Sequence, residues 1–420
     1  MENRLIKTWG EDRHRYRPVI IVIGICGLFA ALGIGRFALG MMLPAMGEAL
    51  HLSYSQMGTI GTLNFCGYLG AVLFCGRLTG FFGARLLIFL ALMLVGGSMV
   101  VIGCTDRLGL IMLLYLLTGI GSALANVPIM ALIGAWFEPA VRGRASGMVV
   151  IGNGFGIVLA GHLVPVLNAT AGGWRMSWLV LGGLALVMAV ICGIFARNRP
   201  ADGYRSGAGA IAAGQTGGMV LSRGEMRRMT LHCAAIYFLF GCTYVIYVTF
   251  LVTSLVQERG FSEQYAGLLW SIVGFLSLGS GPIFGWLSDR FGRRAGLKLV
   301  FAIQATAYFS AMTLLPLPFL YLSILCFGLV AWSIPPIMAA LVGDFAGPEK
   351  TASIFGFVTF VFGIGQIIGP YGAGLLAEVS GGFSLGFAAA GLLALGAVWL
   401  ASRLPSAGQG NTFRPRSVGQ

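Results

Sequence analysis

Gly-Trp-Leu-Ser-Asp-Arg-Phe-Gly-Arg-Arg, residues 285–294, is the segment of the sequence that indicates the fold most clearly. It joins two apolar segments, at about 264–287 and 296–315, and each is long enough to cross the hydrocarbon core of a bilayer as a helix. Its charged residues make the connection too polar to stay in lipid, and its glycines allow a tight turn. The stretch therefore predicts two membrane-spanning helices joined by a basic loop.

The whole chain has the composition of a membrane protein. Hydrophobic residues make up 57% of its 420 residues and charged residues only 10%, against about 25% charged in soluble proteins. The first apolar run continues past the length of a signal-peptide core, so we interpret it as a spanning helix. The sequence predicts an all-α membrane protein with twelve transmembrane helices, at about 19–45, 55–76, 85–104, 108–136, 145–168, 175–196, 229–255, 264–287, 296–315, 317–343, 352–377 and 383–402.

The basic residues indicate the orientation of the chain. With the N-terminus in the cytoplasm, nearly all of the 27 Lys and Arg residues fall on the cytoplasmic side, as the positive-inside rule requires. Only Arg107, Arg175 and Arg259 fall outside, and Arg36 lies within a segment. Both termini are therefore expected in the cytoplasm. This orientation explains the formal net charge of +13, so nucleic acid is not expected as a partner.

An internal repeat divides the chain. A shift of 209 residues superposes Gly76 on Gly285, Gly83 on Gly292, Gly119 on Gly328 and Gly154 on Gly363. Between the copies, residues 203–218 are rich in Gly, Ala and Ser, which is typical of a flexible linker. We expect a cytoplasmic N-terminal tail (1–18), a six-helix bundle (19–196), a cytoplasmic linker (197–228), a second six-helix bundle (229–403) and a cytoplasmic C-terminal tail (404–420).

Residues 285–294 resemble the G-x-x-x-D-R-x-G-R-R signature of the major facilitator superfamily, and with the repeat this resemblance covers residues 19–403. It implies two pseudo-symmetric six-helix bundles, with the first, fourth, seventh and tenth helices around a central cavity. The runs 33–44 and 67–71 are similar to the bacterial YbfB/YjiJ-type branch. That similarity implies a transporter of the bacterial plasma (inner) membrane and indicates no substrate.

The signature also implies a latch that closes the cytoplasmic side. Asp289 is expected to face the start of the helix near residues 351–353, where the helix dipole favours a carboxylate. The first copy of the loop has Gly80 in place of the aspartate, so the latch is expected to depend on Asp289. The alternative is a basic turn that only orients the chain. The predicted gating residues are Asp289, Arg290, Gly292, Arg293, Arg294, Gly76, Gly83, Arg85, Arg142 and Arg144.

Arg36 is the one fixed charge deep in an apolar segment of the sequence. A charge at that depth costs at least about 2.5 kcal/mol, so it is a sign of function. Its guanidinium offers a permanent charge and a planar set of donors suited to carboxylate, sulfonate or phosphate. The alternative is an arginine that snorkels outward or binds backbone carbonyls of a neighbouring helix. We predict that Arg36 binds an anionic substrate.

Other polar and aromatic side chains at membrane depth complete the predicted site. Tyr244 and Tyr247 are three residues apart, so they are expected to share one helix face. For each of these side chains, packing between helices is an equally good explanation. The predicted substrate-binding residues are Arg36, Asn64, Tyr68, Asn126, Tyr244, Tyr247, Trp270, Trp332 and Gln366.

The sequence offers little for other chemistry. No Asp or Glu lies deep in a segment, so a buried carboxylate is not available as a proton carrier. His162 is a titratable alternative, and an acidic substrate can itself carry the proton. The eight cysteines and four histidines form no metal-ligand pattern, and no nucleophile–base constellation is found. We expect no cofactor, no metal site and no enzymatic activity.

The leading hypothesis is a secondary transporter that moves a small organic anion, such as a carboxylate, by alternating access. The first alternative is an efflux pump for amphipathic drugs or toxic compounds, in which Arg36 is structural. The second is a receptor or scaffold that keeps the fold without transport. The expected partners are a small-molecule substrate, the lipid bilayer and, as an open alternative, a coupling proton. The chain is expected to be a monomer.

Overall fold

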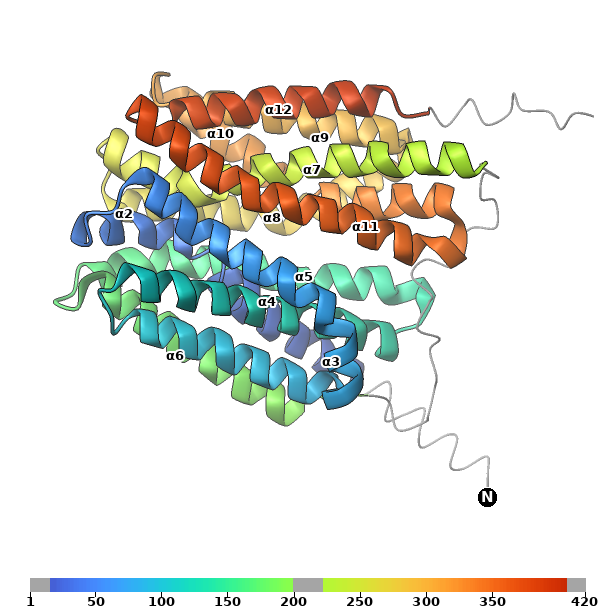
Figure 1. The fold of residues 1–420 in the computed structure, drawn as a ribbon, viewed down its shortest axis with the longest axis horizontal. Coiled ribbons are helices and arrows are strands. Elements are labelled where there is room, and N and C mark those ends of the chain that lie inside the picture. The colour runs from blue at the N-terminus through green and yellow to red at the C-terminus, as the bar shows by residue number, and fades with distance from the viewer. Residues whose placement is uncertain (1–15, 199–221, 406–420) are drawn as a thin grey trace, which may run out of the picture.

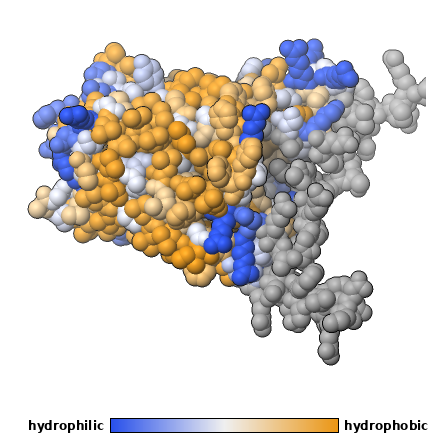
Figure 2. Space-filling model, turned by 60° about the horizontal axis from the view of Figure 1, so that its bottom comes forward, coloured by the Kyte–Doolittle hydropathy of each residue, from blue (hydrophilic) through white to orange (hydrophobic). Residues whose placement is uncertain are grey.

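The computed structural model describes residues 16–198 and 222–405, and all regular structure in them is helical. The helices run side by side along the molecule (Figure 1). Figure 2 shows apolar side chains over the middle of the surface and hydrophilic side chains toward its two ends. A bilayer core accepts this arrangement because a helix satisfies its own backbone hydrogen bonds. The prediction of an all-α membrane protein is confirmed.

Serine caps begin several of the helices. Ser53 and Ser222 each form a capping box, and Ser262 accepts a hydrogen bond from the backbone of Tyr265, which satisfies donors that a helix start leaves open. Helical residues 16–28 continue into η1 (Phe29–Ile34) and α2 (Leu39–Ala49). The other elements are α3 (Tyr54–Ile102), α4 (Leu108–Trp136), α5 (Pro139–Asn168), α6 (Gly173–Phe195), α7 (Arg223–Thr253), η2 (Ser254–Glu258), α8 (Glu263–Phe291), α9 (Arg293–Ser310), α10 (Leu317–Val330), α11 (Ile334–Ser380) and α12 (Ser384–Ser402).

Ten helices of the described residues are long and apolar enough to cross a membrane. The 49-residue α3 is broken into two arms at Gly83, whose φ is 72°, a conformation that glycine adopts without a steric penalty. Gly292, between α8 and α9, has φ 92° and holds the position that the 209-residue shift superposes on Gly83. A count of twelve spans needs both arms of α3 and the 18-residue α9, and it stays a prediction.

Arginine contacts repeat between the two parts of the chain. Arg85 Nε donates to the carbonyl oxygen of Gly193 (2.7 Å), near the end of α6. Arg294 Nη1 donates to the carbonyl oxygen of Leu404 (3.2 Å), just beyond α12. Each arginine follows the turn glycine of its own loop and binds carbonyl groups left open where the last helix of its part ends.

Close helix contacts repeat in the same way. A Cβ atom at Gly119 would overlap the backbone of Asn64, and one at Gly328 would lie 3.4 Å from the Cα atom of Val273. Asn64 and Val273 are themselves 209 residues apart. Small residues of this kind let helices approach closely in lipid. The superposed glycines therefore hold equivalent helix pairs, α3 with α4 and α8 with α10.

Elements up to α6, coloured blue to green, lie together, and those from α7 onward, coloured yellow to red, lie together (Figure 1). We call residues 16–198 the first half and residues 222–405 the second half. The halves meet where α3 packs on α11 and where α5 packs on α8. The predicted bundle boundaries, 19–196 and 229–403, stay predictions. Most of each predicted tail and of the predicted linker lies outside the described residues, which leave out 1–15, 199–221 and 406–420.

Candidate functional site

Arg36 lies where the first helix loses its regular hydrogen bonding. Residues 29–34 form a π-helical segment and residues 35–38 form a turn before α2. Gly33 allows the segment to press against α5, because a Cβ atom there would lie 2.9 Å from the Cα atom of Gly156. Interruptions of this kind are frequent at functional sites. The turn buries the Arg36 side chain, which is 8% exposed.

Neutral groups surround the Arg36 guanidinium. Nε donates to Asn64 Oδ1 (3.2 Å). The guanidinium carbon lies 4.7 Å from the ring centroid of Phe65 and 4.2 Å from that of Tyr68. A cation over an aromatic face gains about 0.5–2 kcal/mol, and more of this is realised when the cation is desolvated. The first arm of α3 thus stabilises the charge without neutralising it.

A ring of hydrogen bonds fixes this group in place. Asn64 Nδ2 donates to the carbonyl oxygen of Tyr115 (3.2 Å), and the Tyr115 hydroxyl donates to the carbonyl oxygen of Arg36 (3.0 Å). The ring ties the first helix, α3 and α4 together. Tyr115 was not among the predicted residues. Its hydroxyl in the apolar run 108–136 was the available signal, but a sequence does not show which neighbour a helix face meets.

Arg36 retains an unused donor. Its Nη2 atom is buried and has no hydrogen-bond partner among the described residues. Together with Asn64, Phe65 and Val248, the side chain lines a small cavity of about 10 Å³, close to the space that one water molecule needs. A buried donor without an acceptor costs about 1–3 kcal/mol, and more when it is charged. The site is therefore complementary to an added acceptor, above all an anionic one.

Two predicted polar pairs flank the arginine. In the first half, Asn126 Nδ2 donates to the Tyr68 hydroxyl (2.8 Å). In the second half, Gln366 Nε2 donates to the Tyr244 hydroxyl. The ring centroids of Tyr244 and Trp332 lie 6.1 Å apart. The pairs come from α3, α4, α7 and α11, so segments distant in sequence converge on one region.

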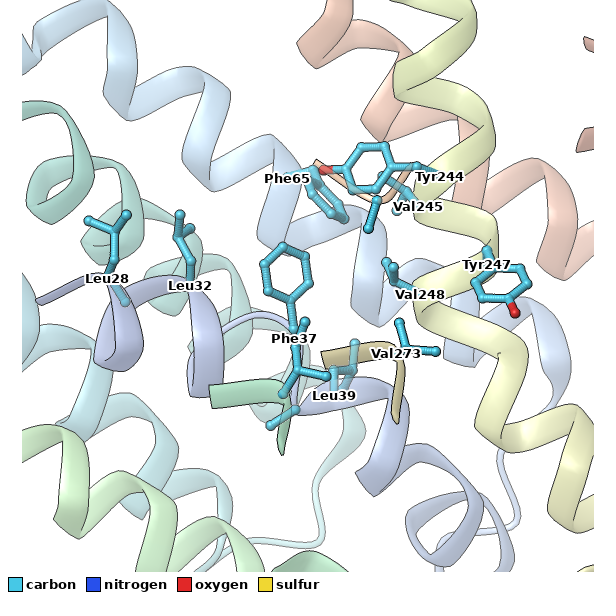
Figure 3. Close-up of a cluster of buried hydrophobic side chains, with 14 of the residues drawn as sticks. Leu28, Leu32, Phe37, Leu39, Phe65, Tyr244, Val245, Tyr247, Val248 and Val273 are labelled. Carbon is cyan, nitrogen blue, oxygen red and sulfur yellow. The ribbon is translucent and has the colours of Figure 1, made fainter. Parts of the chain in front are cut away.

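Arg36 and its neighbours connect the halves. The ring centroids of Phe37 and Trp332 lie 4.9 Å apart, and the Tyr244 hydroxyl is within side-chain hydrogen-bonding and electrostatic range of Arg36. Figure 3 shows Phe37, Phe65 and Tyr244 directed toward one another. The structure thus brings together Arg36, Asn64, Tyr68, Asn126, Tyr244, Trp332 and Gln366 at the boundary between the halves.

Tyr247 and Trp270 lie away from this group. The Tyr247 ring stacks on Phe327 (4.0 Å between centroids), and its hydroxyl is 2.9 Å from Ser323 Oγ, inside the second half. Figure 3 shows Tyr247 directed away from Tyr244. The expected shared face is corrected, because side chains three residues apart differ in direction by about 60°, enough here to separate the site from the core. Trp270 is wholly buried in α8, with no hydrogen bond or ring contact to Arg36 within the described residues.

The predicted cytoplasmic latch has a different partner. Arg293 forms ion pairs with Asp289 and, from Nε, with Asp344 Oδ2 (3.0 Å). The expected contact of Asp289 with residues 351–353 does not form in the part of the chain that the structure describes, and Thr351 donates instead to the Gly347 carbonyl oxygen. Asp289 and Arg293 lie on either side of the turn at Gly292 and pair four residues apart.

Two other predicted gating residues, Arg142 and Arg290, contact their own half. Arg142 Nη2 donates to the Gly134 carbonyl oxygen (2.9 Å), and the Arg290 guanidinium lies 5.5 Å from the Trp286 ring centroid. Arg144 is exposed. The glycine at position 76 has open space around it. Their roles in gating stay predictions.

Contacts between the halves gather at the opposite end, which carries the α2–α3 and α5–α6 connections. Glu378 Oε2 accepts from the Ser55 backbone N–H (3.1 Å) at the start of α3. Glu263 Oε2 accepts from Asn168 Nδ2 (2.8 Å), where α5 meets α8. A carboxylate at a helix start is stabilised by the helix dipole. The kind of contact expected for Asp289 is thus made by Glu378, at the other end of the molecule.

The fold and the site define a class of protein: multi-pass helical membrane proteins with a polar site between two halves, the architecture of membrane transporters. The family model of the Major Facilitator Superfamily matches residues 25–370 and 234–417. The chain belongs to this superfamily. The likeness to the YbfB/YjiJ-type branch stays a prediction.

Curated relatives over nearly the full length are transporters. The "Hexuronate transporter" of Bacillus subtilis (strain 168) is 25% identical over 405 residues, which cover 90% of this chain and 92% of the relative. The "Probable sulfoacetate transporter SauU" of Cupriavidus necator is 25% identical over 418 residues, covering 92% and 94%.

A solved structure shares the fold. The crystal structure of a bacterial homolog to the human lysosomal transporter Spinster, inward-facing and unoccupied, matches with a TM-score of 0.68 at 15% identity, covering 92% of this chain and 96% of that one. Family and relatives together make this chain a membrane transporter of a small molecule and not an enzyme.

Proposed function

We propose that this protein is a secondary active transporter of a small organic anion, such as a carboxylate, in the bacterial inner membrane. The observation that carries the proposal is the buried Nη2 atom of Arg36, which has no acceptor among the described residues. An anionic oxygen is the strongest partner for such a donor. The curated relatives support the substrate class, since hexuronate and sulfoacetate are both organic anions.

Alternating access follows from the two ends of the molecule. We assign the basic end, with both termini, to the cytoplasm, so the contacts of Glu378 with Ser55 and of Glu263 with Asn168 hold the outer end closed. Opening that end requires these contacts to separate. Closing the inner end would involve the loop of Asp289, so the two halves rock around the central arginine.

A proton is the coupling ion that the site residues support best. An organic acid can carry the proton itself. His162 offers a second route, because its Nδ1 atom lies 2.8 Å from Ser271 Oγ across the contact between α5 and α8. The proposal expects uptake to respond to an imposed pH gradient.

Reconstituted vesicles test the proposal. The experiment measures uptake of labelled carboxylates and sulfonates by the full chain, by Arg36→Ala and by Tyr247→Phe, a control distant from the site. We expect saturable uptake that Arg36→Ala lowers at least about 10-fold, because a hydrogen bond to a charged group contributes about 1.5–3 kcal/mol, while Tyr247→Phe keeps it. Full uptake of the anion by folded Arg36→Ala would contradict the proposal. Export of amphipathic drugs by the parent protein and by Arg36→Ala, without anion uptake by either, would favour the efflux alternative.

A further inference from the structure

An aromatic wall in the second half reaches the arginine through Tyr244. We give this name to Tyr237, Phe240 and Tyr244 of α7 and Phe362 of α11. The Tyr237 and Phe362 rings are stacked 4.3 Å apart, and those of Phe240 and Tyr244 are stacked 4.8 Å apart. The wall continues through Tyr244 to Trp332 and Phe37. Its four rings stack on one another, and a stacked aromatic cluster favours a flat or apolar partner.

Most polar groups beside the wall already have partners. Asn126 donates to Tyr68 and Gln366 donates to Tyr244. Arg36 Nη2 and Trp332 Nε1 are buried donors that have no partner among the described residues. A substrate with many hydroxyl groups would bury them against the rings, where they have no hydrogen-bond partner. Each such hydroxyl group would cost about 0.5–2 kcal/mol of binding free energy.

The charge of the site also limits the substrate. Arg36 is the single cation deep in the spans of the sequence, and no acidic residue accompanies it. Buried ions require a counter-ion, because desolvation costs several kcal/mol per ion. One guanidinium neutralises one negative charge, so the second charge of a dianion would be buried without a partner.

We propose that the substrate is a monoanion with a compact apolar or aromatic body and at most one further hydrogen-bond acceptor. Its acid group binds Arg36, its body stacks between Phe37 and the aromatic wall, and its acceptor meets Trp332 Nε1. This inference rests on the proposed function and narrows it. The inference excludes sugar acids and dianions as preferred substrates.

Four probes test the substrate class in the purified full-length protein. Benzoate carries one charge and a ring, phthalate adds a second charge to the same ring, glucuronate carries one charge on a hydroxylated body, and acetate lacks the body. Titration calorimetry measures the four dissociation constants. We expect benzoate to bind at least about 10-fold more tightly than each of the other three, which corresponds to about 1.4 kcal/mol.

Variants of single residues test which side chains cause the preference for benzoate. Phe362→Ser is expected to weaken benzoate binding several-fold and to leave acetate binding unchanged, because only benzoate reaches the wall. Trp332→Phe keeps the ring and removes the donor, so it is expected to preserve benzoate binding and to weaken binding of 2-oxo acids. Tyr247→Phe is the control for each measurement.

The results distinguish the two proposals. Glucuronate or phthalate binding as tightly as benzoate, with binding lost in Arg36→Gln, would overturn this inference and keep the anion site. Binding of no probe, or binding that Arg36→Gln leaves intact, would overturn the proposed function as well.

Discussion

The two halves place different chemistry at equivalent positions. In the first half, a charge, an amide and a hydroxyl interact in the membrane interior through Arg36, Asn64 and Tyr115. The shift of 209 residues superposes these three on Val245, Val273 and Ile324, which are all apolar and buried. The helix contacts around both groups are alike, since Gly119 and Gly328 pack on Asn64 and Val273.

This difference shows how a protein built from two repeated halves can have a single substrate site. The repeat supplies matching helix pairs and loops, while the polar groups that bind a charge occur in the first half alone at these positions. The second half contributes stacked aromatic rings, among them Tyr244 and Phe362. In the proposed function, the first half therefore binds the charged group of the substrate and the second half binds its apolar body. A bound substrate would connect the two halves.

The largest expected effect comes from moving the charge. Val245→Arg places a guanidinium at the position equivalent to Arg36, where Val273 and Ile324 offer no hydrogen bond. An uncompensated buried charge costs about 3–5 kcal/mol, so we expect a large loss of thermal stability in detergent. Val245→Leu is the control, and its thermal stability should be close to that of the parent protein. A stable Val245→Arg protein would show that both halves accommodate the charge, which would contradict the difference between the halves.

The paired glycines test the same comparison through packing. Gly119→Ala would overlap the Asn64 backbone, whereas a Cβ atom at Gly328 meets a side chain, Leu276 Cβ, at 2.9 Å. Overpacking costs about 1–3 kcal/mol. We expect Gly119→Ala to lower both stability and anion affinity, because it displaces Asn64. Gly328→Ala should lower stability less and keep the affinity. Equal loss of affinity in both variants would contradict the account.

Asn64→Leu tests the support of the arginine. It removes the acceptor of Arg36 Nε and the donor to the Tyr115 carbonyl, and a hydrogen bond to a charged group contributes about 1.5–3 kcal/mol. We expect anion affinity, measured by titration calorimetry, to fall about 10-fold. Val273→Leu, at the equivalent position, should keep it. Unchanged affinity in Asn64→Leu would show that Arg36 needs no positioning by α3.

The sequence predicted much of this arrangement for physical reasons. Lipid requires long apolar helices, so the all-α membrane fold could be predicted, and the cost of a deep charge singled out Arg36. Interhelical contacts were harder, because an apolar helix hardly indicates which face meets which neighbour. Tyr115 was missed and Tyr247 was misplaced for that reason. Asp289 pairs with Arg293 across the turn at Gly292, and its expected place opposite residues 351–353 stays a prediction.

The smallest expected effect is that of Tyr115→Phe. The change removes one neutral hydrogen bond, to the Arg36 carbonyl oxygen, which contributes about 0.5–1.5 kcal/mol. We expect a small loss of thermal stability and a two- to fivefold weaker anion affinity. Tyr247→Phe removes a comparable bond to Ser323 in the second half, so it should lower stability alone. If both variants changed affinity equally, the hydroxyl of Tyr115 would have no special relation to the site.

The central claim is that Arg36 is the counter-ion of the transported anion. The most direct measurement is the ratio of benzoate to benzamide affinity, two probes of nearly the same shape that differ in charge, for the parent and for Arg36→Gln. We predict that the parent prefers benzoate at least about 10-fold, since pairing with an ionised group roughly doubles the strength of a hydrogen bond, and that Arg36→Gln binds the two equally. The same preference for benzoate in both proteins would contradict the account.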